Sequence, residues 1–90
     1  MSCKNKLFEI RRDLKSNNFE FSIHAYERMV ERGIFATDIL ALIKNGLKHS
    51  VWIEKHGSWN FSGQGIGPDI ITIACTYNNY GTLIVTVFWK

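Results

Sequence analysis

The sequence predicts a small α+β domain whose N-terminal helices pack against one side of a four-stranded antiparallel sheet. Residues 1–46 hold 14 of the 19 charged side chains and residues 47–90 hold only 5, as expected for surface helices followed by a sheet. Apolar residues recur at helical spacing in the first half, and β-branched and aromatic residues form continuous runs in the second. With 90 residues, 46% of them hydrophobic, we expect a single domain over residues 1–90 with one core.

The first helix is predicted over residues 3–15. Leu7, Ile10 and Leu14 recur at spacings of three and four, which places them on one face of a helix. Charged residues occupy most of the positions between them, and Ser2 is a candidate N-cap. An amphipathic helix with its apolar side toward the sheet is the expected result.

A short extended stretch over residues 19–21 precedes the second helix, which is predicted over residues 23–32. Ser22 can cap its N-terminus, and Gly33 suits the left-handed position that follows a helix end. One side of this helix is apolar and is expected to enter the core. The residues on that side are Ile23, Tyr26 and Val30.

The third helix is predicted over residues 36–45 because four apolar residues recur there with helical spacing. These residues are Ile39, Leu40, Leu42 and Ile43. Gly46 follows Asn45 and is a clear stop signal, so the helix should end at this point.

Four strands are predicted in the second half of the chain. Two short apolar segments, residues 51–53 and 59–61, flank a polar turn at residues 55–58 and predict a hairpin. The glycine-rich segment 63–68 is predicted to be a flexible loop, because it lacks the helix and the Gly-Lys-Ser/Thr motif of a phosphate loop. The longest β-branched and aromatic runs are predicted to form the central antiparallel pair, over residues 70–77 and 83–89.

The second helix also carries the densest set of candidate functional residues. His24, Arg28 and Arg32 fall within about 80° of one another, on the helix side opposite the apolar residues. Arginine forks bind phosphate oxygens and an imidazole can move a proton near neutral pH, so this row suits a phosphodiester. The alternative is a solvated helix face, on which Arg28 pairs with Glu27 or Glu31 and His24 bonds a backbone carbonyl.

The pattern H-A-x-x-R-M-x-x-R-G-I, from His24 to Ile34, resembles that of the domain of unknown function 4258 family. Asp38-Ile39, the helix end at Asn45-Gly46 and the two closing strands extend the resemblance over about residues 19–89. The layout of helices followed by four strands is similar to the RelE/MqsR-like ribonuclease toxin fold. Members of that superfamily typically cleave mRNA without a metal and are neutralised by a partner antitoxin. The comparison with the ribonuclease toxins is an analogy between folds.

One departure from the family pattern concerns the start of the third helix. The family often has a small polar residue able to cap this helix at the position that Phe35 occupies here. Thr37 or Asp38 is then expected to act as the cap. The helix would accordingly begin a turn later.

The resemblance implies a small bacterial toxin-like protein that acts as a metal-independent endoribonuclease, an mRNA interferase of a toxin–antitoxin system. Such chemistry needs a base for the 2′-OH, an acid for the leaving oxygen and cations for the phosphate charge. The candidate catalytic residues are His24, Arg28, Arg32, Lys55, His56 and Tyr77, with His24 as the acid/base and both arginines on the phosphate. The candidate RNA-binding residues, mostly aromatic side chains that can stack bases, are Trp59, Tyr80, Trp89 and Lys90.

The same residues also have structural interpretations. These are a polar turn for Lys55 and His56, the core or its edge for Trp59 and Trp89, and packing at a strand end for Tyr77. The alternative function is a non-catalytic RNA- or protein-binding module of the same fold, in which both arginines bond backbone carbonyls. A third hypothesis is self-association through an exposed strand edge.

Composition argues against several other classes. No apolar run approaches the roughly 18–20 residues that span a bilayer, and the N-terminus lacks a signal-peptide pattern. The histidines and the two cysteines, Cys3 and Cys75, have no metal-ligand spacing, and reduced thiols are typical of the cytosol. We therefore expect a cytoplasmic protein with no metal, no cofactor and no membrane partner. The net charge of +3 is small, so any anion site must be local.

Overall fold

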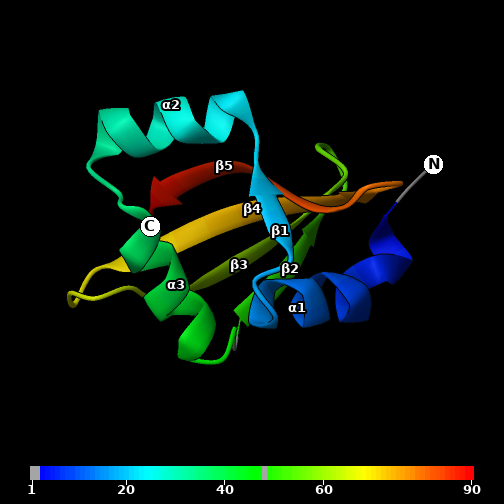
Figure 1. Cartoon of the computed structure of the whole chain (residues 1–90), viewed down its shortest axis with the longest axis horizontal. Coiled ribbons are helices and arrows are strands. Elements are labelled where there is room, and N and C mark those ends of the chain that lie inside the picture. Colours follow the sequence, from blue (N-terminus) through cyan, green and yellow to red (C-terminus); the bar gives the residue numbers. More distant parts are fainter. Residues whose placement is uncertain (1–2, 48) are drawn as a thin grey trace.

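The computed structural model describes residues 3–47 and 49–90. It confirms the α+β class, with the helices in the first half of the chain. The sheet has five strands in the order β1-β5-β4-β3-β2. The elements are, in chain order, the short 3₁₀ turn η1 (Lys4–Lys6), α1 (Leu7–Lys15), β1 (Phe19–Phe21), α2 (Ile23–Arg32), α3 (Ala36–Lys44), β2 (His49–Ile53), β3 (Ser58–Gln64), β4 (Ile70–Asn78) and β5 (Gly81–Trp89) (Figure 1).

The prediction of four antiparallel strands is wrong, because the sheet is mixed and has a fifth strand. The extended stretch Phe19–Phe21 joins it as β1 and pairs in parallel with the start of β5, where Glu20 lies opposite Leu83. The other three pairings are antiparallel, and β4 and β5 are neighbours as predicted. A three-residue segment carries too little alternation to reveal its pairing with a strand far along the chain.

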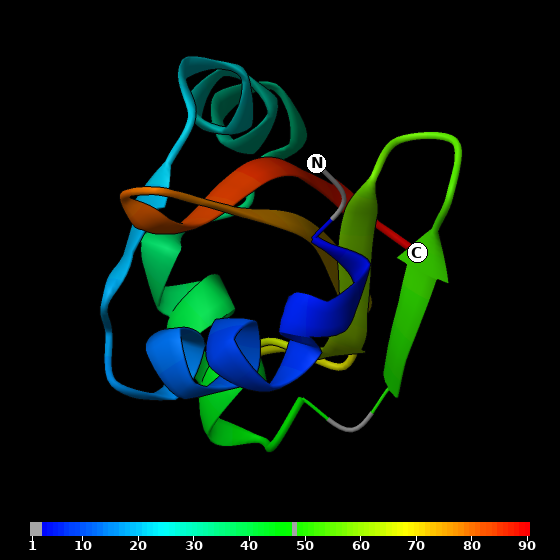
Figure 2. The same ribbon diagram turned by 90° about the vertical axis from the view of Figure 1, so that its right-hand side faces the viewer.

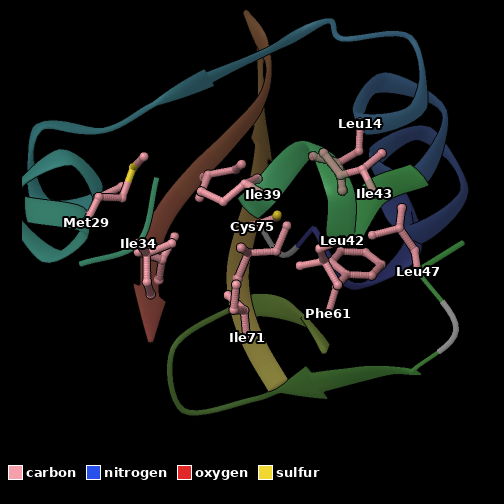
Figure 3. Packing of buried hydrophobic residues seen from close by; sticks show 14 of the residues in the cluster. Leu14, Met29, Ile34, Ile39, Leu42, Ile43, Leu47, Phe61, Ile71 and Cys75 are labelled. Atoms are coloured by element: carbon pink, nitrogen blue, oxygen red, sulfur yellow. The ribbon is translucent and has the colours of Figure 1, made fainter. Parts of the chain in front are cut away.

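The main core lies between the sheet and the helices α1 and α3, which pack on one of its faces (Figure 2). Strand alternation turns Ile71, Ile73 and Cys75 of β4 toward these helices, and each is at most 1% exposed. Figure 3 shows this cluster, in which side chains from the helices and from β3 and β4 converge. The other face of the sheet, directed away from α1 and α3, is called the outer face below.

Helix α2 lies along the edge of β5, across the sheet from α1 and α3 (Figure 1, Figure 2). Strand β1 pairs only with the first part of β5, and α2 continues along the rest of that edge. Ser22 Oγ donates a hydrogen bond to Val85 O at 3.0 Å, and Arg32 Nη1 donates one to Val87 O at 2.7 Å. The expectation that all helices cover one side of the sheet is therefore wrong for α2.

The side of α2 that was expected to enter the core faces solvent instead. Ile23, Tyr26 and Val30 are 80%, 56% and 84% exposed, whereas Ala25 and Met29 are 0% and 7% exposed. The helix side that meets β5 carries Ala25 and Met29, which belong to the core cluster, and Arg32, which bonds Val87 O. Periodicity within the helix does not show which of its sides meets a distant strand.

The ends of the helices follow the sequence signals only in part. Ser22 Oγ accepts the Ala25 N–H and caps α2 as predicted, and Gly33 ends it in the left-handed region at φ 64°. Helix α3 begins at Ala36, directly after Phe35, so the prediction of a later start is wrong. Asp38 Oδ2 accepts the Phe35 N–H at 3.0 Å, which satisfies an N-terminal donor from inside the helix. The predicted cap Ser2 lies outside the described residues.

The glycine-rich segment is not a flexible loop throughout, contrary to the prediction. Gly63 and Gln64 are the last residues of β3, which is longer than predicted at both ends, and β2 also begins earlier than predicted. Gly65 is buried against α3. A Cβ added there would lie 3.2 Å from Asp38 O and 2.7 Å from Ile71 Cδ1. The missing side chain lets the end of β3 approach the helix closely.

The variant Gly65→Ala is expected to lower the free energy of unfolding by about 1–3 kcal/mol. The helix backbone at Asp38 cannot give way as the tip of a side chain can, so α3 and the sheet must shift apart. Urea denaturation measures the loss. Gly67→Ala is the matched control, because a Cβ there meets nothing within 4 Å. Equal stabilities of the two variants would contradict this packing role.

Candidate functional site

The candidate site is a depression on the outer face of the sheet, with a volume of about 610 Å³. It runs from α2 across β5, β4 and β3 to the turn between β2 and β3. Its floor is made by the strand residues that alternate with those of the core. The lining residues are His24, His56, Ser58, Asn60, Ala74, Thr76, Val85, Thr86 and Phe88. We call this feature the outer-face depression.

Two imidazoles from distant segments line the outer-face depression. His24 belongs to the first turn of α2, which the Ser22 cap and its bond to β5 hold in place. His56 belongs to the β2–β3 turn, where its backbone N–H donates a hydrogen bond to Ile53 O at 3.2 Å. Gly57 follows with φ 60°, a left-handed conformation that favours glycine. Both histidines are exposed to solvent, and both line the same depression.

The floor of the outer-face depression combines the apolar side chains of Ala74, Val85 and Phe88 with several polar groups. Ser58 is only 3% exposed, and its Oγ lies 3.5 Å from Asn60 Oδ1. Thr76 and Thr86 add two hydroxyl groups, and Phe88 supplies the one phenyl ring of the lining. Hydroxyl, amide and phenyl groups beside two imidazoles can hold and protonate a polar ligand that carries a flat ring.

The two arginines of the predicted row are engaged in bonds outside the outer-face depression. Arg28 Nη2 binds Glu31 Oε1 at 2.9 Å, which confirms the pairing that the solvated-face alternative predicted. Arg28 Nε is buried and has no hydrogen-bond partner among the described residues. Arg32 Nη1 bonds Val87 O, and Arg32 O accepts from Trp89 Nε1 at 2.6 Å. Of the row, only His24 lines the depression.

Lys55 and Tyr77 occupy very different positions relative to the two histidines. Lys55 is exposed in the β2–β3 turn, directly before His56. Tyr77 points to the other face of the sheet from its neighbour Thr76 and packs against the core. The Lys6 ammonium lies 5.6 Å from the centre of its ring. The structure therefore does not bring Tyr77 together with the histidines.

The four residues predicted to bind RNA lie outside the outer-face depression. Trp59 packs against the core, and its Nε1 donates to Lys4 O at 3.1 Å. Tyr80 is 99% exposed in the β4–β5 turn. Trp89 ends β5 and is 40% exposed, with Lys90 exposed after it. The position of Trp59 agrees with its structural interpretation as a core-edge residue, whereas Trp89 is exposed.

The sequence interpretation named only the two histidines of the lining and missed the other residues, four of which are small and polar. The missed residues are Ser58, Asn60, Ala74, Thr76, Val85, Thr86 and Phe88. Strand alternation was the available signal, since Asn60 precedes the buried Phe61 and Thr76 follows the buried Cys75. Alternate positions on β3, β4 and β5, taken as one surface, include most of these lining residues.

Burial raises the pKa of the Cys75 thiol, and the nearby Cys3 raises it further, so Cys75 stays a protonated core residue. Among residues 3–47 and 49–90, no three histidine, cysteine or acidic side chains are grouped so as to hold a metal ion. Within the same residues, no helix combines the length and the apolar character needed to cross a membrane.

The chain is an α+β protein, and two histidines line a depression on the outer face of its mixed sheet. Comparison with protein families gives a match over residues 21–89 to the domain of unknown function DUF4258. This match spans most of the chain, and the protein belongs to the DUF4258 family. The comparison with curated proteins gave no significant match, and neither did the comparison with solved structures.

Proposed function

We propose that the protein is a metal-independent endoribonuclease whose proton acceptor and proton donor are His24 and His56. The observation that carries the proposal is that these two imidazoles, from α2 and from the β2–β3 turn, line one depression. Two imidazoles can serve as base and acid in one reaction when one is neutral and the other protonated. The hydroxyl, amide and phenyl groups of the lining suit the ribose, phosphate and base of a single strand.

In the proposed reaction, the neutral imidazole takes the proton of a ribose 2′-OH. The 2′-oxygen attacks the adjacent phosphorus, and the bond from phosphorus to the 5′-oxygen breaks. The protonated imidazole gives its proton to this leaving oxygen. The products are a 2′,3′-cyclic phosphate and a 5′-hydroxyl end, and no electrons are exchanged with another reagent.

The charge on the phosphate needs a cation near the two histidines. Lys55 precedes His56 in the exposed β2–β3 turn and is our first candidate. Arg28 is the second candidate, although its ion pair with Glu31 partly neutralises its charge. For Arg32 we propose a structural role, holding α2 against β5 through its bond to Val87 O.

Incubation with single-stranded RNA in excess EDTA tests this function directly. The expected products carry 2′,3′-cyclic phosphate ends, and a 2′-deoxy strand of the same base sequence should stay intact because it lacks the attacking hydroxyl. RNA that stays intact under these conditions would contradict the proposed activity.

The biological setting that we propose is a bacterial toxin–antitoxin system, with a RelE/MqsR-like toxin in the cytoplasm and a cognate antitoxin as its partner. Support comes from the small α+β architecture, in which three helices precede an antiparallel meander of β2 to β5. Expression in a bacterial host should arrest growth, and coexpression of a small neighbouring gene product should restore it. Normal growth with the protein accumulating in soluble form would contradict this setting.

The variant Phe88→Ala is expected to weaken the binding of single-stranded RNA by about tenfold or more, because stacking on an aromatic ring contributes roughly 1–3 kcal/mol per base. A 2′-O-methyl strand cannot be cleaved through its 2′-oxygen, so fluorescence anisotropy with this strand measures binding alone. Phe8→Ala is the matched control: Phe8 is 77% exposed on α1, across the sheet. Equal affinities of the two variants would remove Phe88 from the binding site.

The second candidate function is a non-catalytic RNA-binding module on the same fold. The bond from Arg32 to the Val87 carbonyl favours it, because a structural role for this arginine was the mark predicted for such a module. A module of this kind would bind the 2′-O-methyl strand and leave ordinary RNA intact. The enzyme would bind the first strand and cleave the second.

A further inference from the structure

The outward side of α2 carries three large apolar side chains that the protein itself does not cover. Ile23, Tyr26 and Val30 are 80%, 56% and 84% exposed, and their spacing of three and four aligns them along the helix. We call these three residues the α2 stripe. A contiguous apolar surface that is left open on a small protein is typical of an interaction site.

Acidic side chains border the α2 stripe on one side. Glu27 and Glu31 are both exposed and follow the stripe at helical spacing. Arg28 binds Glu31 at 2.9 Å, whereas Glu27 forms no ion pair with any of residues 3–47 and 49–90. A second, shallow depression of about 400 Å³ lies here, lined by Tyr26, Glu27, Arg28, Val30 and Glu31. Apolar side chains, the Arg28–Glu31 ion pair and the Glu27 carboxylate therefore meet in one recess.

We infer that the α2 stripe docks an amphipathic helix of a partner protein whose own apolar side is flanked by lysine or arginine. The apolar residues of such a helix would cover Ile23, Tyr26 and Val30, and its cations would face Glu27 and Glu31. The inference does not depend on the proposed RNA chemistry, because no residue that lines the outer-face depression lines this recess.

The charge beside the α2 stripe also favours a basic partner helix over a second copy of the chain. Two antiparallel copies of α2 packed through their stripes would bring the Glu27 carboxylates of both copies near the centre of the contact. Like charges at such close quarters are unfavourable, and no basic side chain of the stripe side compensates them. A basic helix meets the same surface with opposite charge.

Two synthetic peptides test the inference with the full chain. Both carry one helical stripe of leucine and isoleucine, flanked by lysines in the first peptide and by glutamates in the second. Fluorescence anisotropy should show the lysine peptide binding at least tenfold more tightly, with an affinity that falls as salt is added. Similar affinities for the two peptides, or no binding of the lysine peptide, would overturn the inference.

Variants of exposed residues tie the binding to α2. Val30→Asp should abolish binding of the lysine peptide, and Glu27→Lys should shift the preference toward the glutamate peptide. Ile66→Asp is the control, since Ile66 is 70% exposed in the loop before β4 and should not affect binding. Light scattering should show a monomer. A dimer that Val30→Asp dissociates would overturn the inference in favour of a second copy.

Discussion

The variant His24→Ala is expected to cleave RNA about 10²–10⁴ times more slowly than the wild type, the usual range for loss of a positioned acid or base. His24 is exposed, so its removal should leave the stability unchanged. His49→Ala is the matched control, because His49 lies on β2 outside the outer-face depression. A normal rate for His24→Ala, or equal losses for both variants, would contradict the role of His24.

The variant His56→Ala should cause a loss of similar size, and the two losses can be told apart. A substrate whose leaving 5′-oxygen is replaced by sulfur needs little help from an acid, because the thiolate is a better leaving group. This substrate should restore cleavage by the variant that lacks the acid and not by the variant that lacks the base. Rescue of both variants, or of neither, would contradict a division of roles between the two histidines.

The variant Asp13→Ala is expected to lower the free energy of unfolding by about 3 kcal/mol, the upper range for a hydrogen bond to a charged group. Asp13 of α1 is 3% exposed, and its Oδ2 accepts the Thr82 hydroxyl at 2.9 Å. Thr82 is equally buried at the start of β5, so the variant leaves its hydroxyl without this acceptor. Urea denaturation measures the loss.

A double-mutant cycle isolates the contact between α1 and β5. Thr82→Val removes the hydroxyl and keeps the volume of the side chain. The Asp13→Ala change should therefore lower the free energy of unfolding less in the Thr82→Val background than in the wild type. The difference between the two losses is the coupling energy of Asp13 and Thr82. Strictly additive losses of unfolding free energy would show that Asp13 acts through other contacts. One such contact is the Arg12 guanidinium at 3.3 Å, and the hydrogen bond from Arg12 to Asp13 raises the pKa of Arg12.

Local sequence signals predicted most of the helices and strands. The predictions failed where the structure depends on contacts between distant segments of the chain. Ser22 and Gly33 marked the ends of α2 correctly, because capping depends on neighbouring residues. The parallel pairing of β1 with β5 has no local signature, and it changed the sheet from four strands to five. The orientation of α2 also involves a distant element, since Ser22 and Arg32 both bond carbonyl oxygens of β5.

The candidate site could be predicted only in part for the same reason. His24 and His56 were both named from the sequence, but their place in one depression depends on how α2 and the β2–β3 turn are set on the sheet. Tyr77 was named with them although strand alternation turns it to the core face. Phe88 lay in a run that is apolar on both faces, so the sequence pattern did not distinguish it from core residues.

Nuclear magnetic resonance of the three histidine side chains tests most directly whether two imidazoles share one RNA site. The protein is titrated with the uncleavable 2′-O-methyl strand while the imidazole signals are followed. His24 and His56 should shift together with one dissociation constant, and His49 should not respond. A shift of only one of the pair, or no shift of either while the strand binds, would contradict a shared site.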